Sequence, residues 1–215
     1  MNLNLIRLPF KNIIFDFDGV ILDSVPIKSK AFRHIFQDFD KELVDQILEY
    51  HELNGGLSRY KKIEYFFKSV LKRPITEEKV IKYADKFSEI TNKELIDSKY
   101  IIKDVLDFIK NNKNIYNMHI ASGSSHNDLK YICEKLDLSK YFISIDGSPM
   151  EKSLLVENIL IKYGYKEEDT CLVGDSINDY DAASHNNIAF CGYNNKNLNK
   201  VSYHYIDLFD DILQD

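Results

Sequence analysis

Short apolar segments and helix-period segments alternate along the second half of the chain. Runs of mostly apolar residues, bounded by Gly, Ser or Asp, predict buried strands at residues 116–122, 141–145, 170–174 and 187–190, and a first strand at 11–17. Between them, residues 125–136 and 153–163 repeat apolar positions at helical spacing. Strands that alternate with helices predict a parallel sheet with helices on both faces.

Residues 26–95 break this alternation and contain no strand of comparable strength. Helical segments are predicted at 26–39, 41–51, 58–71 and 76–91. Pro26 suits a first helical turn, and Ser58 and Thr76 suit N-cap positions. An all-helical stretch after the first strand predicts an inserted subdomain over the C-terminal edge of the sheet, where ligands bind in this architecture. Residues 193–199 are predicted to form a solvated loop.

Composition narrows the class of protein. The chain has 215 residues, of which 44% are hydrophobic, and this suits one core domain with a small insert. A net charge of −6 argues against non-specific binding of nucleic acid or anionic membranes. No apolar run is long enough to span a membrane, and charged residues interrupt the N-terminus too early for a signal peptide. Three cysteines without a CxxC pair argue against a disulfide scaffold or a structural zinc site, so we expect a cytoplasmic protein.

The first candidate for chemistry is the segment Asp16-Phe17-Asp18-Gly19, directly after an apolar run. Two carboxylates at a strand end are costly unless a cation or a shared proton compensates their charge. Mg²⁺ is a hard ion that takes carboxylate and carbonyl oxygens, so it is the natural cation here. The alternative is an ordinary Asp–Gly turn with solvated acids.

A second acidic pair, Asp175 and Asp179, closes the apolar run 170–174 and opens a helix. Four residues of separation place both carboxylates on one side of a helix. Parallel strands that each end in Asp deliver their carboxylates to the same edge of the sheet. The alternative is that these acids only offset the helix dipole.

Two further elements could hold an anion. Ser122 and Gly123 lie where a strand passes into a helix, and a hydroxyl with free backbone N–H groups makes an anion pocket. Lys152 begins a helix, where it opposes the macrodipole, so neutralisation of a phosphate would explain its position. The alternative is that Ser125 is only an N-cap and that Lys152 is a solvated lysine.

Taken together, these segments resemble the haloacid dehalogenase superfamily over residues 11–190. The D-x-D-G motif of that family matches Asp16 to Gly19, its strand-end Ser or Thr matches Ser122, its lysine matches Lys152, and its G-D-x-x-x-D motif matches Gly174 to Asp179. The sequence DGVILDS followed by Pro26 is similar to phosphoglycolate phosphatase-like and β-phosphoglucomutase-like members. The resemblance implies an α/β fold with a Rossmann-like parallel core at residues 1–24 and 96–215, and a C1-type helical cap at 25–95.

The resemblance also implies roles for individual residues. Asp16 would be the nucleophile that forms an aspartyl-phosphate, and Asp18 the general acid and base. Members that act on carbon–halogen bonds usually lack the second Asp, so Asp18 favours phosphoryl transfer. The implied Mg²⁺ ligands are Asp16, the Asp18 carbonyl and Asp175, with Asp179 in support, and the implied phosphate ligands are Ser122, Gly123 and Lys152.

Substrate choice is expected to lie in the cap, in the segment YHELNGGLSRYKK. A Gly pair permits close approach, and an arginine can grip a carboxylate or phosphate with two hydrogen bonds. The candidates are His51, Asn54, Gly55, Gly56, Ser58 and Arg59, with Asp23 and Asn178 as possible supports of the core site. The alternative is an interhelical turn at the Gly pair and a solvated Arg59.

The leading functional hypothesis is a Mg²⁺-dependent phosphatase acting on a small phosphorylated metabolite, as a monomer or weak dimer without nucleic-acid or membrane partners. A sugar-phosphate phosphomutase would use the same core and differ in whether water or a substrate hydroxyl accepts the phosphoryl group. Two non-catalytic hypotheses are a phospho-accepting switch module and an inactive scaffold that binds a phosphorylated ligand.

Overall fold

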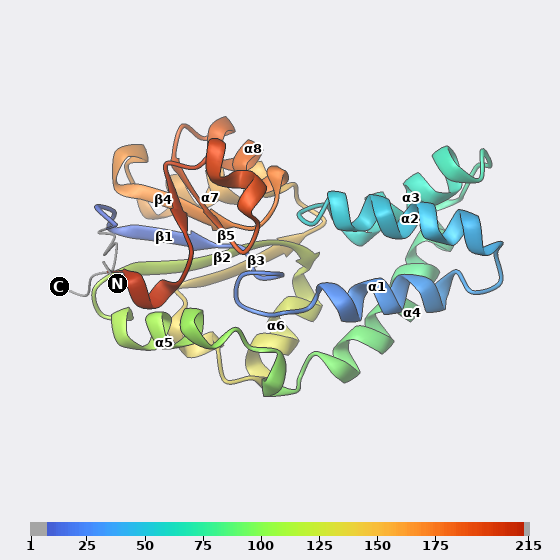
Figure 1. The fold of residues 1–215 in the computed structure, drawn as a ribbon, viewed down its shortest axis with the longest axis horizontal. Helices are drawn as coiled ribbons and strands as arrows, with labels where there is room; N and C mark the ends of the chain where they lie inside the picture. Colours follow the sequence, from blue (N-terminus) through green and yellow to red (C-terminus); the bar gives the residue numbers. More distant parts are fainter. Residues whose placement is uncertain (1–7, 213–215) are drawn as a thin grey trace.

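The computed structural model describes residues 8–212, and its centre is a six-stranded parallel sheet (Figure 1). The strand order is β3-β2-β1-β4-β5-β6, so the first strand in the sequence lies in the middle. The strands are β1 (Asn12–Phe15), β2 (Asn117–Ser125), β3 (Ser144–Ser148), β4 (Thr170–Gly174), β5 (Ala189–Tyr193) and β6 (His204–Ile206). The predicted α/β fold with a parallel sheet is confirmed.

Strand β1 shows why the sheet needs helices on both sides. Ile13 and Phe15 belong to the apolar cluster under α5 (Lys103–Asn112) and α6 (His126–Lys135). Ile14 belongs to the cluster under α7 (Lys152–Tyr163) and α8 (Ile177–His185). Side chains alternate between the faces of a strand, so a continuous apolar run is the pattern of a strand buried on both faces.

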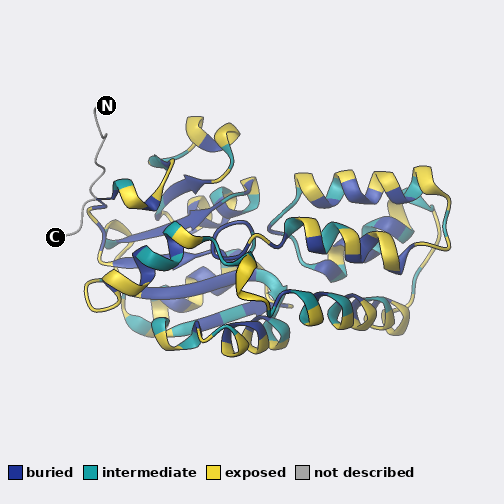
Figure 2. Ribbon diagram, turned by 60° about the horizontal axis from the view of Figure 1, so that its bottom comes forward, coloured by how far each residue is buried: buried dark blue, intermediate teal, exposed yellow. Residues whose placement is uncertain are grey.

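Helices α1–α4 form a second body beyond the ends of the strands, which we call the cap (Figure 2). They are α1 (Val25–Ile35), α2 (Lys41–Leu53), α3 (Arg59–Tyr65) and α4 (Glu77–Glu94). The cap has its own apolar cluster, in which the Phe36 and Phe66 rings lie 4.1 Å apart and the Phe32 and Phe87 rings 4.6 Å apart. In Figure 1 the arrowheads of the central strands point toward the cap.

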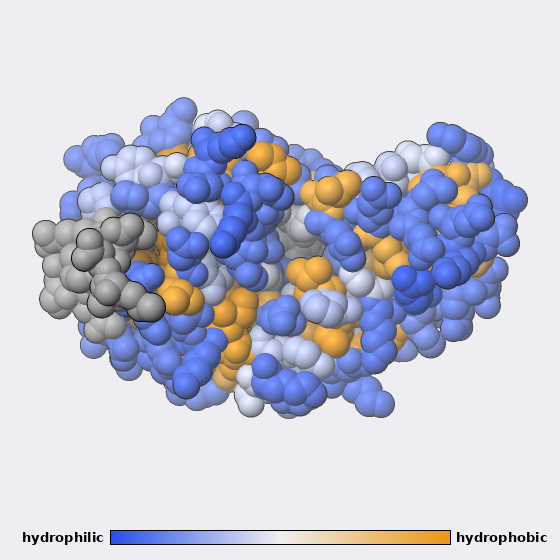
Figure 3. All heavy atoms as spheres, in the orientation of Figure 1, coloured by the Kyte–Doolittle hydropathy of each residue, from blue (hydrophilic) through white to orange (hydrophobic). Residues whose placement is uncertain are grey.

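Two adjacent segments connect the cap to the core. Leu22, on the way into the cap, pairs with Ile101 on the way back. The amide of Asp23 donates to the Tyr100 carbonyl at 2.8 Å, and the Ile102 amide donates to the Ile21 carbonyl at 3.0 Å. Both connections therefore include or pair with the segment that directly follows Asp18 in the sequence. Figure 3 shows a mostly hydrophilic face, with hydrophobic residues gathered near the junction of core and cap.

Several predicted elements differ from the structure. The strand predicted at 141–145 is β3 at Ser144–Ser148, because a 3-10 helix occupies Ser139–Tyr141 and Phe142 is its C-cap. The helix predicted at 58–71 changes after Tyr65 into a π-helical turn at Phe66–Val70. The loop predicted at 193–199 was wrong, because Tyr193 ends β5 and a 3-10 helix occupies Lys196–Lys200. Helix α5 and strand β6 were not predicted.

Candidate active site

The carboxyl ends of three adjacent strands bring the predicted core residues to one edge of the sheet. Strand β1 pairs with β2 on one side and β4 on the other, and Phe15 is in register with both Ile120 and Val173. Asp16 follows β1, Asp175 follows β4, and Ser122 lies in the last part of β2. In parallel strands these ends share one edge, which is why residues more than 100 positions apart meet.

Asp16 is buried directly after the strand. Its amide donates to the Val173 carbonyl at 2.9 Å, and its Oδ1 accepts from the Phe17 amide at 2.7 Å and lies 2.9 Å from Lys152 Nζ. Burial raises the pKa of Asp16 to about 7, with repulsion from Asp179 acting in the same direction and Lys152 opposing it. Lys152 alone therefore does not stabilise the charged form of Asp16 fully, and a further cation near the carboxylate would do so.

Asp16, Asp175 and Asp179 form a compact acidic cluster. One carboxylate oxygen from each lies within 4.8 Å of the others. Burial and the charges of Asp16 and Asp179 raise the pKa of Asp175 well above its ordinary value. Three hard oxygen donors with excess negative charge suit a divalent cation such as Mg²⁺. The sheet edge therefore offers a candidate metal site made of Asp16 and Asp175, which follow two strands, and Asp179 from the first turn of α8.

The local geometry of Asp175 and Asp179 differs from the prediction. Helix α8 begins at Ile177 and its N-cap is Ser176, so Asp175 precedes the helix and the two acids are not one helical turn apart. Asp179 Oδ2 instead accepts from the amide and hydroxyl of Ser176, at 3.0 and 2.7 Å, in a capping box. The chain passes tightly here, since a Cβ on Gly19 (φ +75°) would lie 1.9 Å from Asp175 Oδ2.

Lys152 is not a solvated lysine. It is 8% exposed at the start of α7 and forms ion pairs with both Asp16 and Asp179. Burial lowers its pKa, but the two carboxylates outweigh burial and raise the pKa above its usual range. A permanently charged lysine beside Asp16 is positioned to neutralise an anion bound there.

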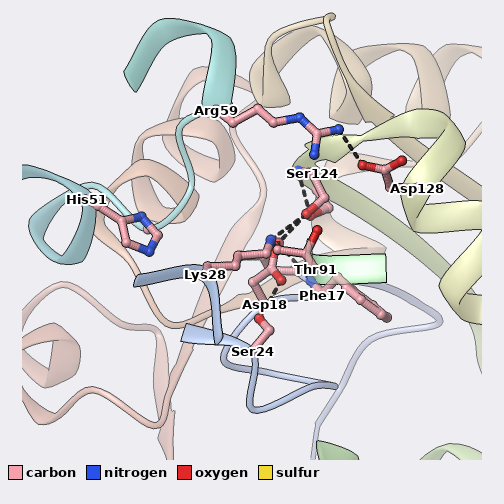
Figure 4. A network of polar contacts seen from close by, with 12 residues as sticks. Phe17, Asp18, Ser24, Lys28, His51, Arg59, Thr91, Ser124 and Asp128 are labelled. Carbon is pink, nitrogen blue, oxygen red and sulfur yellow. Dashed lines mark hydrogen bonds and ion pairs between the residues drawn. The ribbon is translucent and has the colours of Figure 1, made fainter. Parts of the chain in front are cut away.

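Asp18 is the centre of a polar network that joins core and cap (Figure 4). Its carboxylate accepts from Ser24 Oγ at 2.5 Å, from Lys28 Nζ at 2.5 Å and from Ser124 Oγ at 2.7 Å. Burial alone would raise the pKa of Asp18, but the charge of Lys28 and these hydrogen bonds hold it below its usual range. Lys28 comes from the cap helix α1, so the cap contributes directly to the environment of Asp18.

Ser122 and Gly123 lie at the same edge. Ser122 is fully buried, and its hydroxyl accepts from the Ser124 amide at 3.1 Å. A Cβ on Gly123 would lie 2.2 Å from the carbonyl oxygen of Gly56, so the cap loop rests directly on this glycine. Ser125 precedes α6 as its N-cap but makes no capping hydrogen bond through its side chain to the described residues. The end of β2 at Ser122 and Gly123 is thus covered by the cap loop.

The Gly55–Gly56 segment is more than an interhelical turn. A Cβ on Gly55 would lie 3.4 Å from Ser176 Cβ and 3.8 Å from Asp175 Oδ1, and one on Gly56 would lie 2.8 Å from Asn178 Cβ. The loop therefore reaches the acidic edge of the core. The residues on either side of the Gly pair make hydrogen bonds within the cap. Asn54 donates to the Tyr50 carbonyl at 2.9 Å, and Ser58 caps α3.

Arg59 is not solvated, since its guanidinium is buried and pairs with Asp128 of the core helix α6 (Figure 4). The same carboxylate accepts from Ser88 Oγ at 2.9 Å and from Asn92 Nδ2 at 3.0 Å, both in α4. Arg59 thus joins a polar contact between cap and core. Of the supporting candidates, Asp23 is exposed, whereas the buried Oδ1 of Asn178 has no hydrogen-bond partner among the described residues.

A cavity of about 70 Å³ lies between cap and core over this edge. Its wall includes Asp18 and Asp175 from the core side and Lys28, His51 and Lys62 from the cap. His51 Nδ1 lies 2.8 Å from Lys62 Nζ. A cavity with a largely apolar lining and a few polar groups that point into it is the usual place for a small ligand.

Sequence reasoning missed four polar residues of this region. Lys28, Lys62, Ser124 and Asp128 all line the cavity. Lys28 lies one helical turn after Ser24, and this spacing was a usable signal that both face the same side of α1. Lys62 and Asp128 offered no such signal, because their neighbours across the cavity come from distant parts of the chain.

Comparisons with known proteins identify the class of enzyme to which this fold and this sheet edge belong. A model of the family described as haloacid dehalogenase-like hydrolase matches residues 13–193, well over half of the chain. The chain belongs to this hydrolase family, which confirms the resemblance seen in the sequence. A search of curated protein sequences finds no match.

Solved structures with the same fold include several family members. A β-phosphoglucomutase from Clostridium difficile is 18% identical, with 95% of this chain and 93% of that one covered and a TM-score of 0.75. A variant of CbbY from Rhodobacter sphaeroides, in complex with xylulose 1,5-bisphosphate, is 16% identical over 93% and 95%, with a TM-score of 0.76. A predicted phosphoglycolate phosphatase from Haemophilus somnus is 17% identical over 95% and 92%, with a TM-score of 0.67.

At these identities the structural likeness establishes the shared fold. The family match establishes the hydrolase class, and family members typically use a metal ion, for which the acidic cluster provides ligands. Within residues 8–212, no helix combines the length and apolar character needed to cross a membrane.

Proposed function

We propose that this protein is a Mg²⁺-dependent phosphatase that hydrolyses a small phosphorylated metabolite through an aspartyl-phosphate on Asp16. The observation that carries the proposal is the position of the Asp16 carboxylate. It is buried at the end of β1, 2.9 Å from Lys152 Nζ and within the three-carboxylate cluster, and the D-x-D-G motif places Asp18 two residues further on. A cytoplasmic location remains the expectation from the sequence.

The residues divide the reaction into two steps. A carboxylate oxygen of Asp16 attacks phosphorus, the bond to the substrate oxygen breaks, and Asp18 gives its proton to the departing alkoxide. Asp18 then takes a proton from water as the water oxygen attacks phosphorus, and this releases phosphate and restores Asp16. Two steps with an enzyme nucleophile replace one very slow direct hydrolysis.

The remaining residues bind and orient the phosphoryl group. Lys152 supplies a fixed positive charge beside Asp16, and the Ser122 hydroxyl with the Gly123 backbone lies at the adjoining strand end. Asp16, the Asp18 carbonyl, Asp175 and Asp179 are the proposed Mg²⁺ ligands. When bound, Mg²⁺ offsets the negative charge of the carboxylates and of the phosphoryl oxygens.

The direct test is Asp16→Asn assayed with a generic phosphomonoester in the presence of Mg²⁺. We expect phosphate release to fall to background, because an amide cannot form the aspartyl-phosphate. Asp181→Asn, an exposed acid in α8, is the matched control and is expected to keep the wild-type rate. Chelation of divalent cations is expected to abolish turnover, and added Mg²⁺ to restore it. Wild-type rates in Asp16→Asn would refute the assignment of the nucleophile.

A sugar-phosphate phosphomutase is the second candidate, because a β-phosphoglucomutase is among the structures that share this fold. The two activities differ in the acceptor of the phosphoryl group, which is water in one and a substrate hydroxyl in the other. Incubation with a hexose 1-phosphate separates them, since isomer without free phosphate indicates the mutase and free phosphate indicates the phosphatase.

A further inference from the structure

Lys62 is a buried cation on the cap side of the cavity that has no carboxylate partner in the described part of the chain. Lys62 is 2% exposed. Its Nζ lies 2.8 Å from His51 Nδ1 and 3.5 Å from the carbonyl oxygens of His51 and Gly55. None of the ion pairs among residues 8–212 includes it. A buried ammonium without a counter-charge lowers the free energy of unfolding, so its presence beside a cavity indicates a functional role.

The neighbouring cations of the cavity wall are already compensated. Lys28 pairs with Asp18, and Arg59 pairs with Asp128. Burial and the nearby charge of Lys28 lower the pKa of Lys62 to about 7, which is the physical expression of its missing partner. An anion placed in the cavity beside Lys62 would supply that partner.

His51 adds a second unsatisfied group at the same place. It is 3% exposed, and burial lowers the pKa of its ring to about 2, so the ring is neutral. Because Lys62 donates to Nδ1, the ring proton is assigned to Nε2, and this buried atom has no hydrogen-bond partner in the described chain. Figure 4 shows the His51 ring across the site from Asp128, directed toward Lys28.

We propose that Lys62 and His51 form a subsite for a second anionic group of the substrate, a carboxylate or a second phosphate. This inference rests on the proposed function, since the first phosphoryl group is taken to lie at Asp16. Lys62 gives a charged donor and His51 Nε2 a neutral one, and the pair occupies the cap wall of the cavity, whereas Asp18 and Asp175 lie on its core wall. The subsite thus assigns the substrate to the class of phosphate esters that carry a second anionic group.

The test uses matched substrates that differ by one charge. Phosphate esters of ω-hydroxy carboxylic acids with one to three methylene groups are compared with alkyl phosphates of the same chain length, and bisphosphates of the same lengths distinguish phosphate from carboxylate. Charge-assisted hydrogen bonds predict that, at the best chain length, kcat/KM for the ester with a second anionic group exceeds that of its alkyl partner by about 10- to 100-fold. A ratio near one for every chain length in the wild-type enzyme would overturn the subsite.

The variant Lys62→Met keeps an unbranched side chain, one atom shorter, and removes the charge. We expect the preference ratio to fall by about 10-fold or more, and the melting temperature without ligand to rise, because an uncompensated buried charge is gone. Lys61→Met is the control, since Lys61 pairs with Glu151 at the surface and is expected to keep the ratio. A lower melting temperature with an unchanged ratio would assign Lys62 a purely structural role and overturn the proposal.

Failure of the subsite and failure of the proposed function give different results. Hydrolysis that depends on Asp16 but shows no charge preference would overturn the subsite alone. Absence of hydrolysis, with calorimetric binding that still favours the esters with a second anionic group and loses this preference in Lys62→Met, would overturn the phosphatase and support the subsite. Absence of any preference in binding would overturn the subsite in either case.

Discussion

Lys28 Nζ of the cap lies 2.5 Å from Asp18 Oδ2 of the core, so the proposed general acid is paired with a residue that belongs to the other part of the molecule. Both side chains are largely buried, with 14% and 13% of their surfaces exposed. The position of the cap therefore affects the protonation of Asp18. Lys28 favours the charged form of Asp18, which is the form that takes a proton from water in the second step of the proposed reaction.

Replacement of Lys28 by Met is expected to shift the pH profile of activity. Loss of the ammonium removes the main influence that lowers the pKa of Asp18, and burial then raises it. The protonated acid persists to higher pH, so the alkaline limb of kcat/KM should move upward by about one to three pH units. Lys30→Met, on the same helix but paired with Glu94 within the cap, is the control. An unchanged profile in Lys28→Met would contradict the role given to Asp18.

The contact between Gly123 and the cap loop predicts a steric effect on catalysis. In Gly123→Ala the new methyl would lie 2.2 Å from the Gly56 carbonyl oxygen, and backbone cannot move as a side chain does. We expect the cap to seat poorly and kcat/KM to fall at least about 10-fold. Gly55→Ala meets its nearest atom at 3.4 Å and should have a much smaller effect. Equal losses in the two variants, with unchanged melting temperatures, would exclude this explanation.

Asp128 is expected to stabilise the closed arrangement of cap and core. Its carboxylate accepts from Arg59, Ser88 and Asn92, and Asp128→Ala would leave the Arg59 guanidinium buried and unpaired. We expect the free energy of unfolding to fall by about 3 kcal/mol, measured by urea denaturation. Asp45→Ala breaks the surface pair with Arg33, whose side chain is 55% exposed, and should cost under about 1 kcal/mol. Equal costs would show that the Asp128 contacts contribute no more than a surface pair.

His119 predicts how stability depends on pH. It is buried in β2, with Nδ1 2.9 Å from Ser144 Oγ and Nε2 3.0 Å from Tyr165 Oη, and burial lowers its pKa from 6.5 to about 4. Between these pH values the unfolded chain binds more protons than the folded chain, so the free energy of unfolding falls on acidification, by up to about 3 kcal/mol.

The variant His119→Gln should lose that part of the slope. Unfolding free energies measured from pH 7 to pH 4.5 are expected to change less with pH in His119→Gln than in the wild type. Part of the slope will remain, because burial also lowers the pKa of His51. His34→Gln, an exposed position, should keep the full wild-type slope. A wild-type slope in His119→Gln would mean that different groups cause the acid sensitivity.

The sequence by itself determined the parallel core and the acidic edge. Apolar runs that end in Asp at residues 16 and 175 are informative because parallel strands all end at one edge, whichever order they take in the sheet. Local patterns sufficed for this result, including the helical character of the cap. They also placed β3 wrongly by three residues, since a 3-10 helix ends at Tyr141 and an apolar pattern cannot tell a strand residue from a packed turn.

Only the tertiary structure decided which side chains face each other across the cavity. Nothing in the sequence indicated that Arg59, a candidate for substrate binding, pairs with Asp128 once the cap docks on the core. Lys28 meets Asp18, whereas Lys62 meets His51 and backbone oxygens, because of the angle at which the cap rests on the core. Such contacts join residues through packing between two separate apolar clusters, and no periodicity along the chain records that packing.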